Sequence, residues 1–495
     1  MHTNIGDYMK NKSIWLKDIK PKKNIEKLNN DIDVDVDILI IGGGIAGIQT
    51  AFNLNNSGKN ICLIDKDKIG FGTSSCSTGK LTFLQSDMLY KIQKIHGFRK
   101  TKQYYYSTKE AIDFVKNTVL ENNIECDFEE VPSYLYTVND DENKILNETA
   151  KFLKRVNQEF EYVDNDKLPF KINKCIKVEN TAIFNPVKYI IEVKKICNNI
   201  KFYENVTAID IKKFKSKYII KTNVNTIKAK KVVVATHYPF FITPGLIPFK
   251  THLERSYIAA FKYDFLNKMS GINLKKPILS IRSYDDDYLL YSSCSHKMTN
   301  HINYEERYKE LILDVKNKFD CKIDYIWMAH DITSNDILPL IGKLDKNLFV
   351  ATAFNKWGMT NGTIAGLILS DLCTGKKNAY SKLFSPSRDI TLKKIVNFFV
   401  DMTNITKIYT ATTLIKNHSF YRSNVYVKYI NDELCGIYID ASNKKHIVKN
   451  KCPHMKCNLI FNSVDKTWDC PCHGSRFDID GNIIEGPSTY NIKID

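Results

Sequence analysis

The sequence predicts an α/β domain followed by a small all-β domain, and three features support this prediction. A short apolar strand runs into a glycine-rich turn and a helix at 35–56. A second glycine-rich segment at 355–363 opens an apolar helix. Short runs of β-branched and aromatic residues begin near residue 409. The 495 residues exceed one ordinary domain, and a hydrophobic content of 43% suffices for real cores.

The first element is an apolar strand at 35–41 that ends in spaced glycines. Gly42, Gly44 and Gly47 form the pattern G-x-G-x-x-G, and 48–56 is typical of the helix that follows. Glycines permit a tight turn and a close backbone approach, which would place a pyrophosphate at the N-terminus of that helix.

A second apolar strand at 60–64 ends in Asp65, which lies 23 positions after Gly42. This spacing is close to the roughly 20 residues that separate the glycines from a ribose-binding carboxylate. Because the strand, the helix and the acid are all in place, we expect the N-terminal segment to bind a dinucleotide.

Later segments indicate which dinucleotide is bound. A strand-like run at 347–352 leads into the glycine-rich segment 355–363, and 364–372 is expected to form a helix. A second such loop suits a flavin, which needs donors near its ring and ribityl chain as well as its pyrophosphate. A third strand at 231–236 ends in Ala-Thr, an ending common in flavoproteins. We therefore expect FAD.

The C-terminal region carries two Cys/His pairs. Cys452 and His454 form one pair, and Cys470 and His473 form the other. A Rieske-type [2Fe–2S] cluster needs two thiolates on one iron and two imidazoles on the other, so these four residues are the expected ligands.

Tetrahedral zinc is the alternative, since two Cys and two His also satisfy it. Zinc fingers usually pair Cys with Cys and His with His, whereas each short loop here offers one of each, which favours the cluster. Cys457 and Cys472 lie close to the ligand pairs. A disulfide between them could tie the two loops together, or both could remain thiols.

Segments 452–457 and 468–478 resemble the two cluster-binding boxes of Rieske domains, and 481–487 resembles the segment that follows them. Lys456 stands where the family usually has Gly, so the backbone turn of the first loop is in doubt.

The second box keeps one of two hydroxyls that hydrogen-bond the cluster sulfurs in high-potential Rieske proteins. Ser475 matches the serine, but Phe477 stands at the tyrosine position. Losing a hydrogen bond to a sulfur disfavours the reduced cluster. The resemblance therefore implies a reduction potential below the top of the Rieske range, which is about +300 mV.

With the segment 70–75, the flavin motifs resemble the D-amino-acid-oxidase-like (DAO) superfamily of FAD-dependent oxidoreductases. The pairing with a C-terminal Rieske domain is similar to that of bacterial members, and the resemblance runs from Ser13 to Pro487. It implies an FAD-binding Rossmann-like domain of the glutathione-reductase/DAO type with a mixed-sheet substrate region. A small all-β Rieske domain is expected to follow.

The expected division of the chain has three parts. The oxidoreductase occupies 1–384, a linker and connecting helix occupy 385–408, and the Rieske domain occupies 409–495. Within the oxidoreductase, the FAD-binding segments are expected at 35–84, 200–250 and 335–376, and the substrate region at 85–200 and 250–335.

The motifs and the resemblance also nominate site residues. The candidates for binding FAD are Gly42, Gly44, Ala46, Gly47, Asp65, Lys66, Gly72, Thr73, Ser74, Lys80, Ala208, Ala235, Thr236, Gly358, Met359, Thr360 and Asn361. The candidates for binding a substrate carboxylate or lying beside the flavin are Lys356, Arg255, Tyr257 and His330, with Arg282 and Tyr284 also considered. Each of these could instead be an ordinary surface or core residue. Cys76 is either a small buried residue or a covalent attachment point for the flavin.

The two centres together predict an order of events. A flavin accepts a hydride and a [2Fe–2S] cluster carries one electron at a time. We therefore expect substrate oxidation at FAD, followed by transfer to the cluster and to an external acceptor, either a protein or a quinone. By resemblance the substrate is a small amine or amino acid. The alternatives are an oxygen-using oxidase with a structural or docking Rieske domain, and a non-catalytic redox relay or sensor.

Two other redox classes are disfavoured. No second strand-linked G-x-G-x-x-G marks an NAD(P)H site, which argues against a pyridine-nucleotide ferredoxin reductase. No two-His-one-carboxylate iron site is evident, which argues against a Rieske oxygenase.

Composition limits the partners. The net charge of +17 comes from lysines spread along the chain without a clustered basic run, so nucleic-acid binding is not expected. A basic surface could still help to dock an acidic electron-transfer protein. No stretch approaches the ~18 apolar residues of a membrane span. Nine of the 13 cysteines lie outside the Rieske boxes, which suits a reducing cytoplasm.

Overall fold

The computed structural model describes residues 13–17, 19, 34–163, 168–242, 244–265, 267–274, 277–298, 303–388, 420–422 and 424–494. Most of the expected linker and connecting helix, from residue 389 to 408, lies outside these residues.

A parallel sheet in the order β9-β2-β1-β12-β19 forms the first layer, with β18 antiparallel to β19. The N-terminal half of β12 also pairs with β11, which continues to β10. The strands are β1 Val34–Ile41, β2 Ile61–Ile64, β9 Ile200–Tyr203, β10 Ala208–Phe214, β11 Lys217–Thr222, β12 Thr226–Val234, β18 Leu340–Asp345 and β19 Leu348–Thr352.

Helices cover one face of this sheet. They are α1 Ile45–Leu54, α2 Met88–Glu121, α4 Pro186–Ile196 and α6 Gly358–Thr374, with α1 between α4 and α6. The central strand β1 is apolar throughout its C-terminal half because helices cover one face and a second hydrophobic cluster covers the other. This burial explains why the strand is an unbroken hydrophobic run in the sequence.

Two helices begin earlier than expected. Helix α1 starts at Ile45 rather than at residue 48, and α6 starts at Gly358 rather than at residue 364. In both cases the glycine-rich segment itself forms the first helical turn, which apolar periodicity does not reveal. Helix α6 ends at Thr374, and Gly375, which caps it, has a left-handed φ of 81°.

A second, mixed sheet has the strand order β17-β13-β16-β15-β14-β5-β7-β6, and α5 Tyr304–Phe319 packs on β13 and β16. Its strands are β5 Ser133–Thr137, β6 Glu161–Val163, β7 Lys174–Val178, β13 Thr251–Lys262, β14 Ser270–Asn273, β15 Ser280–Tyr284, β16 Tyr288–Lys297 and β17 Ile323–Ser334. Helix α3 Asn143–Arg155 packs on β5 and β7, and β3 Lys80–Leu81, β8 Ala182–Ile183 and β4 Glu129–Glu130 form a small third sheet. The segment 85–200, which was expected in the substrate region, is therefore divided between the two layers. Some of its strands join the second sheet, whereas its helices α2 and α4 pack on α6 and α1 of the first layer.

The C-terminal region contains two four-stranded antiparallel sheets. Their strands are β20 Phe420–Arg422, β21 Val425–Ile430, β22 Glu433–Ile439, β23 Lys445–Lys449, β24 Ile460–Asn462, β25 Thr467–Asp469, β26 Arg476–Asp478 and β27 Ile483–Glu485. Trp468 is completely buried at the centre of their shared core. The expected succession of an α/β domain and a small all-β domain is confirmed.

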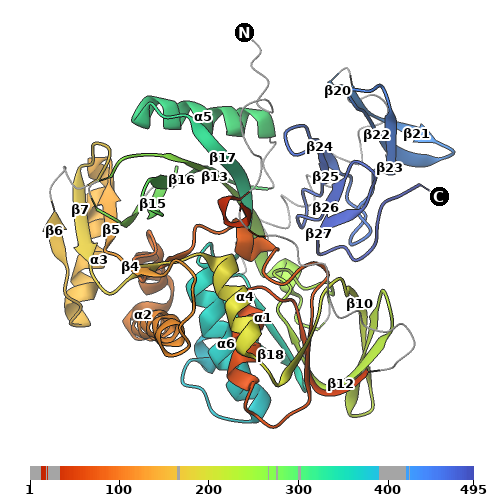
Figure 1. Ribbon diagram of the computed structural model, residues 1–495, viewed down its shortest axis with the longest axis horizontal. Coiled ribbons are helices and arrows are strands. Elements are labelled where there is room, and N and C mark those ends of the chain that lie inside the picture. The colour runs from red at the N-terminus through yellow and green to blue at the C-terminus, as the bar shows by residue number, and fades with distance from the viewer. Residues whose placement is uncertain are drawn as a thin grey trace.

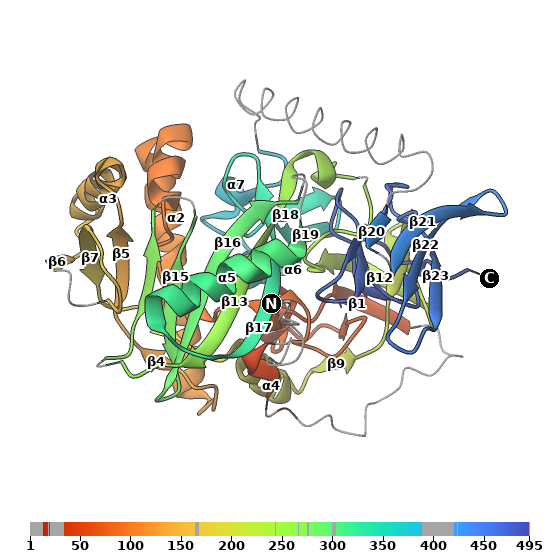
Figure 2. The same cartoon turned by 90° about the horizontal axis from the view of Figure 1, so that it is seen from above.

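Figure 1 shows the C-terminal strands in blue above β10 and beside β13 and β17, with the β5–β7 end of the second sheet on the other side of the molecule. In the view from above, β21–β23 and β5–β7 mark its two ends (Figure 2). Among the described residues, no helix combines the length and the apolar character needed to cross a bilayer.

Candidate flavin and cluster sites

A cavity of about 960 Å³ lies where β1, β2, β12 and β19 end, and its volume suits a large cofactor. The turn after β1 forms part of its wall. Gly42 has a φ of +106°, and a Cβ there would lie 2.5 Å from the carbonyl oxygen of Ala235. Only glycine fits this close approach between two strand ends.

The other two glycines of the motif have different roles. A Cβ at Gly47 would lie 1.8 Å from the carbonyl oxygen of Gly42, so Gly47 keeps the helix against its own turn and does not line the cavity. A Cβ at Gly44 would meet only the Ser74 hydroxyl, at 3.1 Å, on the cavity wall.

Helix α1 begins at the cavity, where Gly44, Ile45 and Ala46 line the wall and the Ser74 hydroxyl accepts a hydrogen bond from the Ile45 N–H at 3.0 Å. Helix α6 also begins there, and its N-cap residue Trp357 makes no side-chain cap. Two helix N-termini facing one cavity favour an anion such as the FAD pyrophosphate. The backbone and the cavity size therefore fit FAD.

Asp65 lies at the end of β2 on the same wall. Its carboxylate accepts hydrogen bonds from the backbone N–H of Gly43 at 2.6 Å and of Asp67 at 2.8 Å. Burial raises the pKa of Asp65 to about 6, against these two hydrogen bonds. The position fits a partner for a ribose hydroxyl.

Most of the nominated FAD residues line the cavity. These are Gly42, Gly44, Ala46, Asp65, Lys66, Gly72, Thr73, Ser74, Lys80, Ala208, Ala235, Thr236, Gly358 and Met359. Gly47, Thr360 and Asn361 do not. The Thr360 hydroxyl accepts a hydrogen bond from Gln85 at 3.0 Å, and the Asn361 amide donates to the Phe354 carbonyl at 2.9 Å, so both serve the packing of α6.

Lys80 brings a buried cation to the cavity wall. Its side chain is 6% exposed, and its ammonium contacts the Ser280 hydroxyl and lies 3.4 Å from the Gly271 carbonyl. The ammonium also lies 5.5 Å from the centre of the Trp357 ring. Burial, with a smaller contribution from Arg282, lowers the pKa of Lys80 to about 7.

The catalytic candidates separate into two groups. Lys356 and His330 line the cavity, and the Lys356 ammonium lies 2.7 Å from a Glu254 carboxylate oxygen. Arg255 and Tyr257 do not line it, and the Tyr257 hydroxyl instead contacts His296 at 3.1 Å.

Arg282 and Tyr284, the two further candidates, have partners within the protein. Cys76 lies on the cavity wall. The Arg282 guanidinium donates to the Thr78, Gly79 and Phe184 carbonyls, whereas the Tyr284 hydroxyl donates to Asp127. Burial raises the pKa of Cys76 to about 11, which keeps its thiol protonated.

The four expected cluster ligands come together at the tips of two adjacent loops. They are Cys452 and His454 on one loop, and Cys470 and His473 on the other. The imidazole centroids of His454 and His473 are 5.1 Å apart. The two thiols hydrogen-bond each other. This hydrogen bond lowers the pKa of Cys452 to about 7 and raises that of Cys470. The Ser475 hydroxyl also hydrogen-bonds Cys452.

The two imidazoles are suited to be metal ligands. Burial lowers the pKa of His454 to about 4 and that of His473 to about 3, so both are neutral at physiological pH. Both nitrogens of His454 and the Nδ1 of His473 are buried with no hydrogen-bond partner among the described residues. Neutral, unpartnered imidazoles beside paired thiols fit the ligand set of a Rieske cluster.

A disulfide joins Cys457 to Cys472 across the two loops, with 6.6 Å between their Cα atoms. Their sulfurs lie within 4.8 Å of the Cys470 sulfur. Of the two states left open by the sequence, the structure contains the disulfide, and it ties the loops together beside the ligands.

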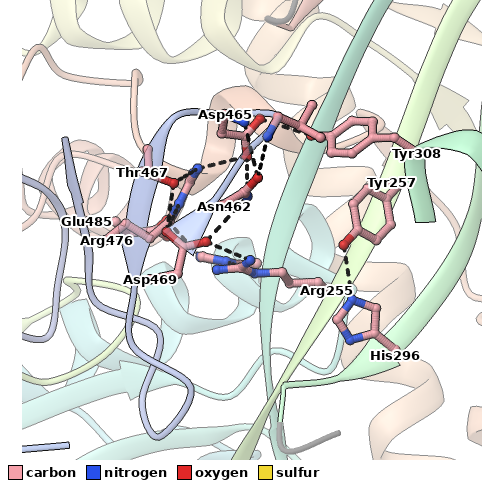
Figure 3. A network of polar contacts seen from close by, with 12 residues as sticks. Arg255, Tyr257, His296, Tyr308, Asn462, Asp465, Thr467, Asp469, Arg476 and Glu485 are labelled. Atoms are coloured by element: carbon pink, nitrogen blue, oxygen red, sulfur yellow. Dashed lines mark hydrogen bonds and ion pairs between the residues drawn. The ribbon is translucent and has the colours of Figure 1, made fainter. Parts of the chain in front are cut away.

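An ion-pair network joins the C-terminal domain to the second sheet (Figure 3). The Arg255 guanidinium on β13 lies 2.8 Å from a carboxylate oxygen of Asp469 on β25, and both side chains are completely buried. Arg476 lies 3.2 Å from Asp469 and 2.9 Å from Asp465. Burial alone would raise the pKa of Asp469, but the two arginines outweigh it and lower that pKa to about 2.

His330 continues this network to the cavity wall. Its Nε2 accepts a hydrogen bond from the Arg255 guanidinium, so its Nδ1 carries the proton and donates to Glu485 at 2.7 Å. Sequence reasoning missed Asp469, Arg476 and Glu485. Only their position in and beside the second box could have suggested them.

Two family models match the chain. The model described as FAD dependent oxidoreductase matches residues 37–372, and that of the Rieske [2Fe-2S] domain matches residues 413–494.

Two curated proteins illustrate the similarity in sequence. The chain is 29% identical to the putative Rieske 2Fe-2S iron-sulfur protein YhfW of Bacillus subtilis, over 93% of each chain. It is 22% identical to gamma-glutamylputrescine oxidoreductase of Escherichia coli, over 71% of this chain and 86% of that protein.

Solved structures share the fold at low identity. Glycine oxidase from Geobacillus kaustophilus superposes with a TM-score of 0.62 at 16% identity, over 72% of this chain and all of that chain. L-amino acid deaminase from Proteus vulgaris superposes with a TM-score of 0.60 at 15% identity, over 74% of this chain and all of that chain.

Proposed function

The chain belongs to the FAD-dependent oxidoreductase family and ends in a Rieske [2Fe–2S] domain, and on that premise we propose that it dehydrogenates a small amine or amino acid and delivers the electrons to an external one-electron acceptor. Its cofactors are FAD and a [2Fe–2S] cluster. The proposal goes beyond family membership in naming the substrate class and the route of the electrons.

One observation carries the proposal: residues of both domains line the same cavity. Arg476 and the segment 484–489 of the Rieske domain form part of the wall that also contains Gly42 and Asp65. Lys66 donates to the Ile484 carbonyl, and the Thr489 hydroxyl donates to the Ile209 carbonyl at 3.5 Å. The Rieske domain therefore lies against the flavin site, as electron transfer within one chain requires.

Lys80 favours a substrate that carries a carboxylate. A buried ammonium without a carboxylate partner costs free energy, and an anion entering the cavity would remove that cost. The cavity is also lined by apolar residues, including Ile258, Ile272 and Met328, which would receive the side chain of such a substrate. Among small amines, amino acids combine both features.

The reaction balances as a dehydrogenation. When an amine is oxidised to an imine, its C–H bond releases a hydride and its N–H bond releases a proton. Bound FAD would accept the hydride, and the cluster would pass its two electrons singly to an oxidised acceptor. His330 and Glu485 would hold the domain contact, and Lys356 would be kept in place by Glu254.

Anaerobic mixing with a panel of amines and amino acids tests the proposal. A productive substrate should bleach the flavin and then reduce the cluster. The Cys470→Ser variant should keep flavin bleaching but lose turnover with ferricyanide, whereas Cys435→Ser, at a buried cysteine outside the ligand set, should keep both. If Cys470→Ser turns over at the wild-type rate with oxygen and ferricyanide alike, the cluster has no part in the reaction. The oxidase with a docking Rieske domain would then replace this proposal.

A further inference from the structure

Tyr238 lies in the turn that follows β12, where the first sheet reaches the cavity. The Thr236 carbonyl accepts a hydrogen bond from the Tyr238 N–H at 2.8 Å, and the Thr236 hydroxyl donates back to the Tyr238 carbonyl at 2.8 Å. The Thr352 hydroxyl at the end of β19 donates to the His237 carbonyl at 2.5 Å. Two neighbouring strands thus fix the position of this turn.

The Tyr238 ring faces both centres. Tyr238 lines the cavity that contains the FAD-binding glycines, and its side chain is only 4% exposed. Its ring centroid lies 5.8 Å from that of His473 and 6.5 Å from that of His454, both in edge-to-face arrangements.

The domain contact holds this arrangement in place. Asp469 directly precedes the ligand Cys470 in the sequence, and its buried ion pair with Arg255 anchors that ligand to β13. Leu253, two residues earlier on β13, packs against Gly474 in the same cluster loop, since a Cβ at Gly474 would lie 3.0 Å from its side chain. The imidazoles therefore face the first domain rather than standing apart from it.

We propose that Tyr238 is the contact through which electrons pass from the flavin to the cluster. This assignment rests on the proposed function and adds the residue that connects the two cofactor sites. Each passage moves one electron and no atom. Two passages remove the electron pair that substrate oxidation delivers, and two equivalents of the external one-electron acceptor each take one electron.

A physical reason supports an aromatic side chain at this place. Electron transfer weakens steeply with the length of empty space between two centres, and a packed ring shortens that space. Tyr238 and His473 are also buried, at 4% and 6% exposed, so moving one electron between them requires little reorganisation of water.

Flash photoreduction tests the assignment without any substrate. Holoprotein that contains FAD and cluster is given one electron per chain by an excited deazaflavin, and absorbance follows how fast the electron equilibrates between flavin and cluster. Tyr238→Leu, which removes the ring, should slow this step by roughly tenfold or more, equivalent to about 1.4 kcal/mol of activation free energy. Tyr238→Phe, the matched control, should keep a rate close to that of the wild type because the ring remains.

Two further readouts separate an electron-transfer role from a structural one. The FAD content and the EPR g-values of the reduced cluster should be the same in all three proteins. If Tyr238→Leu loses a cofactor, Tyr238→Met replaces it, because a methionine fills more of the space left by the ring.

The outcomes distinguish this assignment from the proposed function. If the Leu or Met variant retains both cofactors and equilibrates at the wild-type rate, Tyr238 is not the contact, although the proposed function stands. A rate lost equally in Tyr238→Phe would overturn the assignment of the ring and point to the hydroxyl. If the wild type shows no equilibration between flavin and cluster, the proposed function itself fails.

Discussion

The cavity and the domain contact both contain buried charge, but they compensate it differently. In the contact, Arg255 and Arg476 meet Asp469 and Asp465, so every cation has a carboxylate. In the cavity, the contacts of the Lys80 ammonium are a hydroxyl and a carbonyl, with no carboxylate within ion-pair distance in the described part of the chain. A buried charge with a partner holds a structure together, whereas a buried charge without one is available to a ligand.

The largest expected effect comes from breaking a pair in the contact. Arg255→Met would leave Asp469 with Arg476 alone and should destabilise the protein by about 3–5 kcal/mol, because a buried charge loses a partner. Denaturant unfolding of the holoprotein measures the loss.

Arg307 provides the matched control for that variant. It pairs with Glu310 at 2.6 Å, but the side chains are 38% and 50% exposed, so Arg307→Met should cost only about 0–1 kcal/mol. Equal losses in the two variants would mean that the pair between the domains contributes no more than an exposed one.

Replacing Lys80, the cation without a carboxylate partner among the described residues, should stabilise the protein instead of destabilising it. The size of this effect should depend on pH. The pKa of Lys80 is about 7 in the folded protein and 10.5 as the ordinary value, so between these pH values the unfolded chain binds one more proton. Wild-type stability, relative to Lys80→Met, should therefore rise with pH by about 1.4 kcal/mol per unit across this window.

Unfolding of both proteins at pH 7, 8 and 9 checks the Lys80 prediction. The variant should be the more stable protein at pH 7, and its advantage should shrink as the pH rises. A difference that stays constant with pH would show that the Lys80 ammonium is paired or solvated, and the contrast between the two regions would fail.

The cavity can also be altered without any change in charge. Gly44→Val should weaken FAD binding by roughly 30-fold, or about 2 kcal/mol, because the added carbons enter the space beside the helix N-terminus. The protein around it offers only the Ser74 hydroxyl at 3.1 Å, so the fold should persist. Retention of the cluster, measured as iron and sulfide, separates this effect from misfolding. FAD bound as tightly as in the wild type would place the pyrophosphate elsewhere.

The smallest effect is expected at a neutral hydrogen bond on the cluster side. Ser475→Ala removes the hydroxyl that contacts Cys452, and one hydrogen bond of about 1.4 kcal/mol corresponds to a fall of about 60 mV in the one-electron potential. A redox titration followed by EPR measures the fall. An unchanged potential would mean that the hydroxyl, which also accepts from the Ser488 N–H at 3.0 Å, serves the loop alone.

Local motifs were readable because their residues act close to one another in the chain. The glycines from 42 to 47 and the acid at 65 lie within one strand-turn-helix-strand unit, and each Cys/His pair lies on one short loop. Their chemistry depends on spacing, which the sequence states directly. Even here, Gly47, Thr360 and Asn361 were grouped with cofactor residues although they do not line the cavity, because a motif does not show which side of a helix meets the ligand.

Long-range placement was decided only by the tertiary structure. Arg255 looked like a partner for a substrate carboxylate, but Asp469 from the other domain takes that place. Tyr238 carried no signal beyond following a strand, yet it lies between the cavity and the cluster histidines. The sequence by itself determined both cofactors and the order of the two domains, because each cofactor is bound by short contiguous segments. Which side chains of one domain meet the other depends on how two independently recognisable units pack, and packing brings together residues whose distance along the chain carries no information.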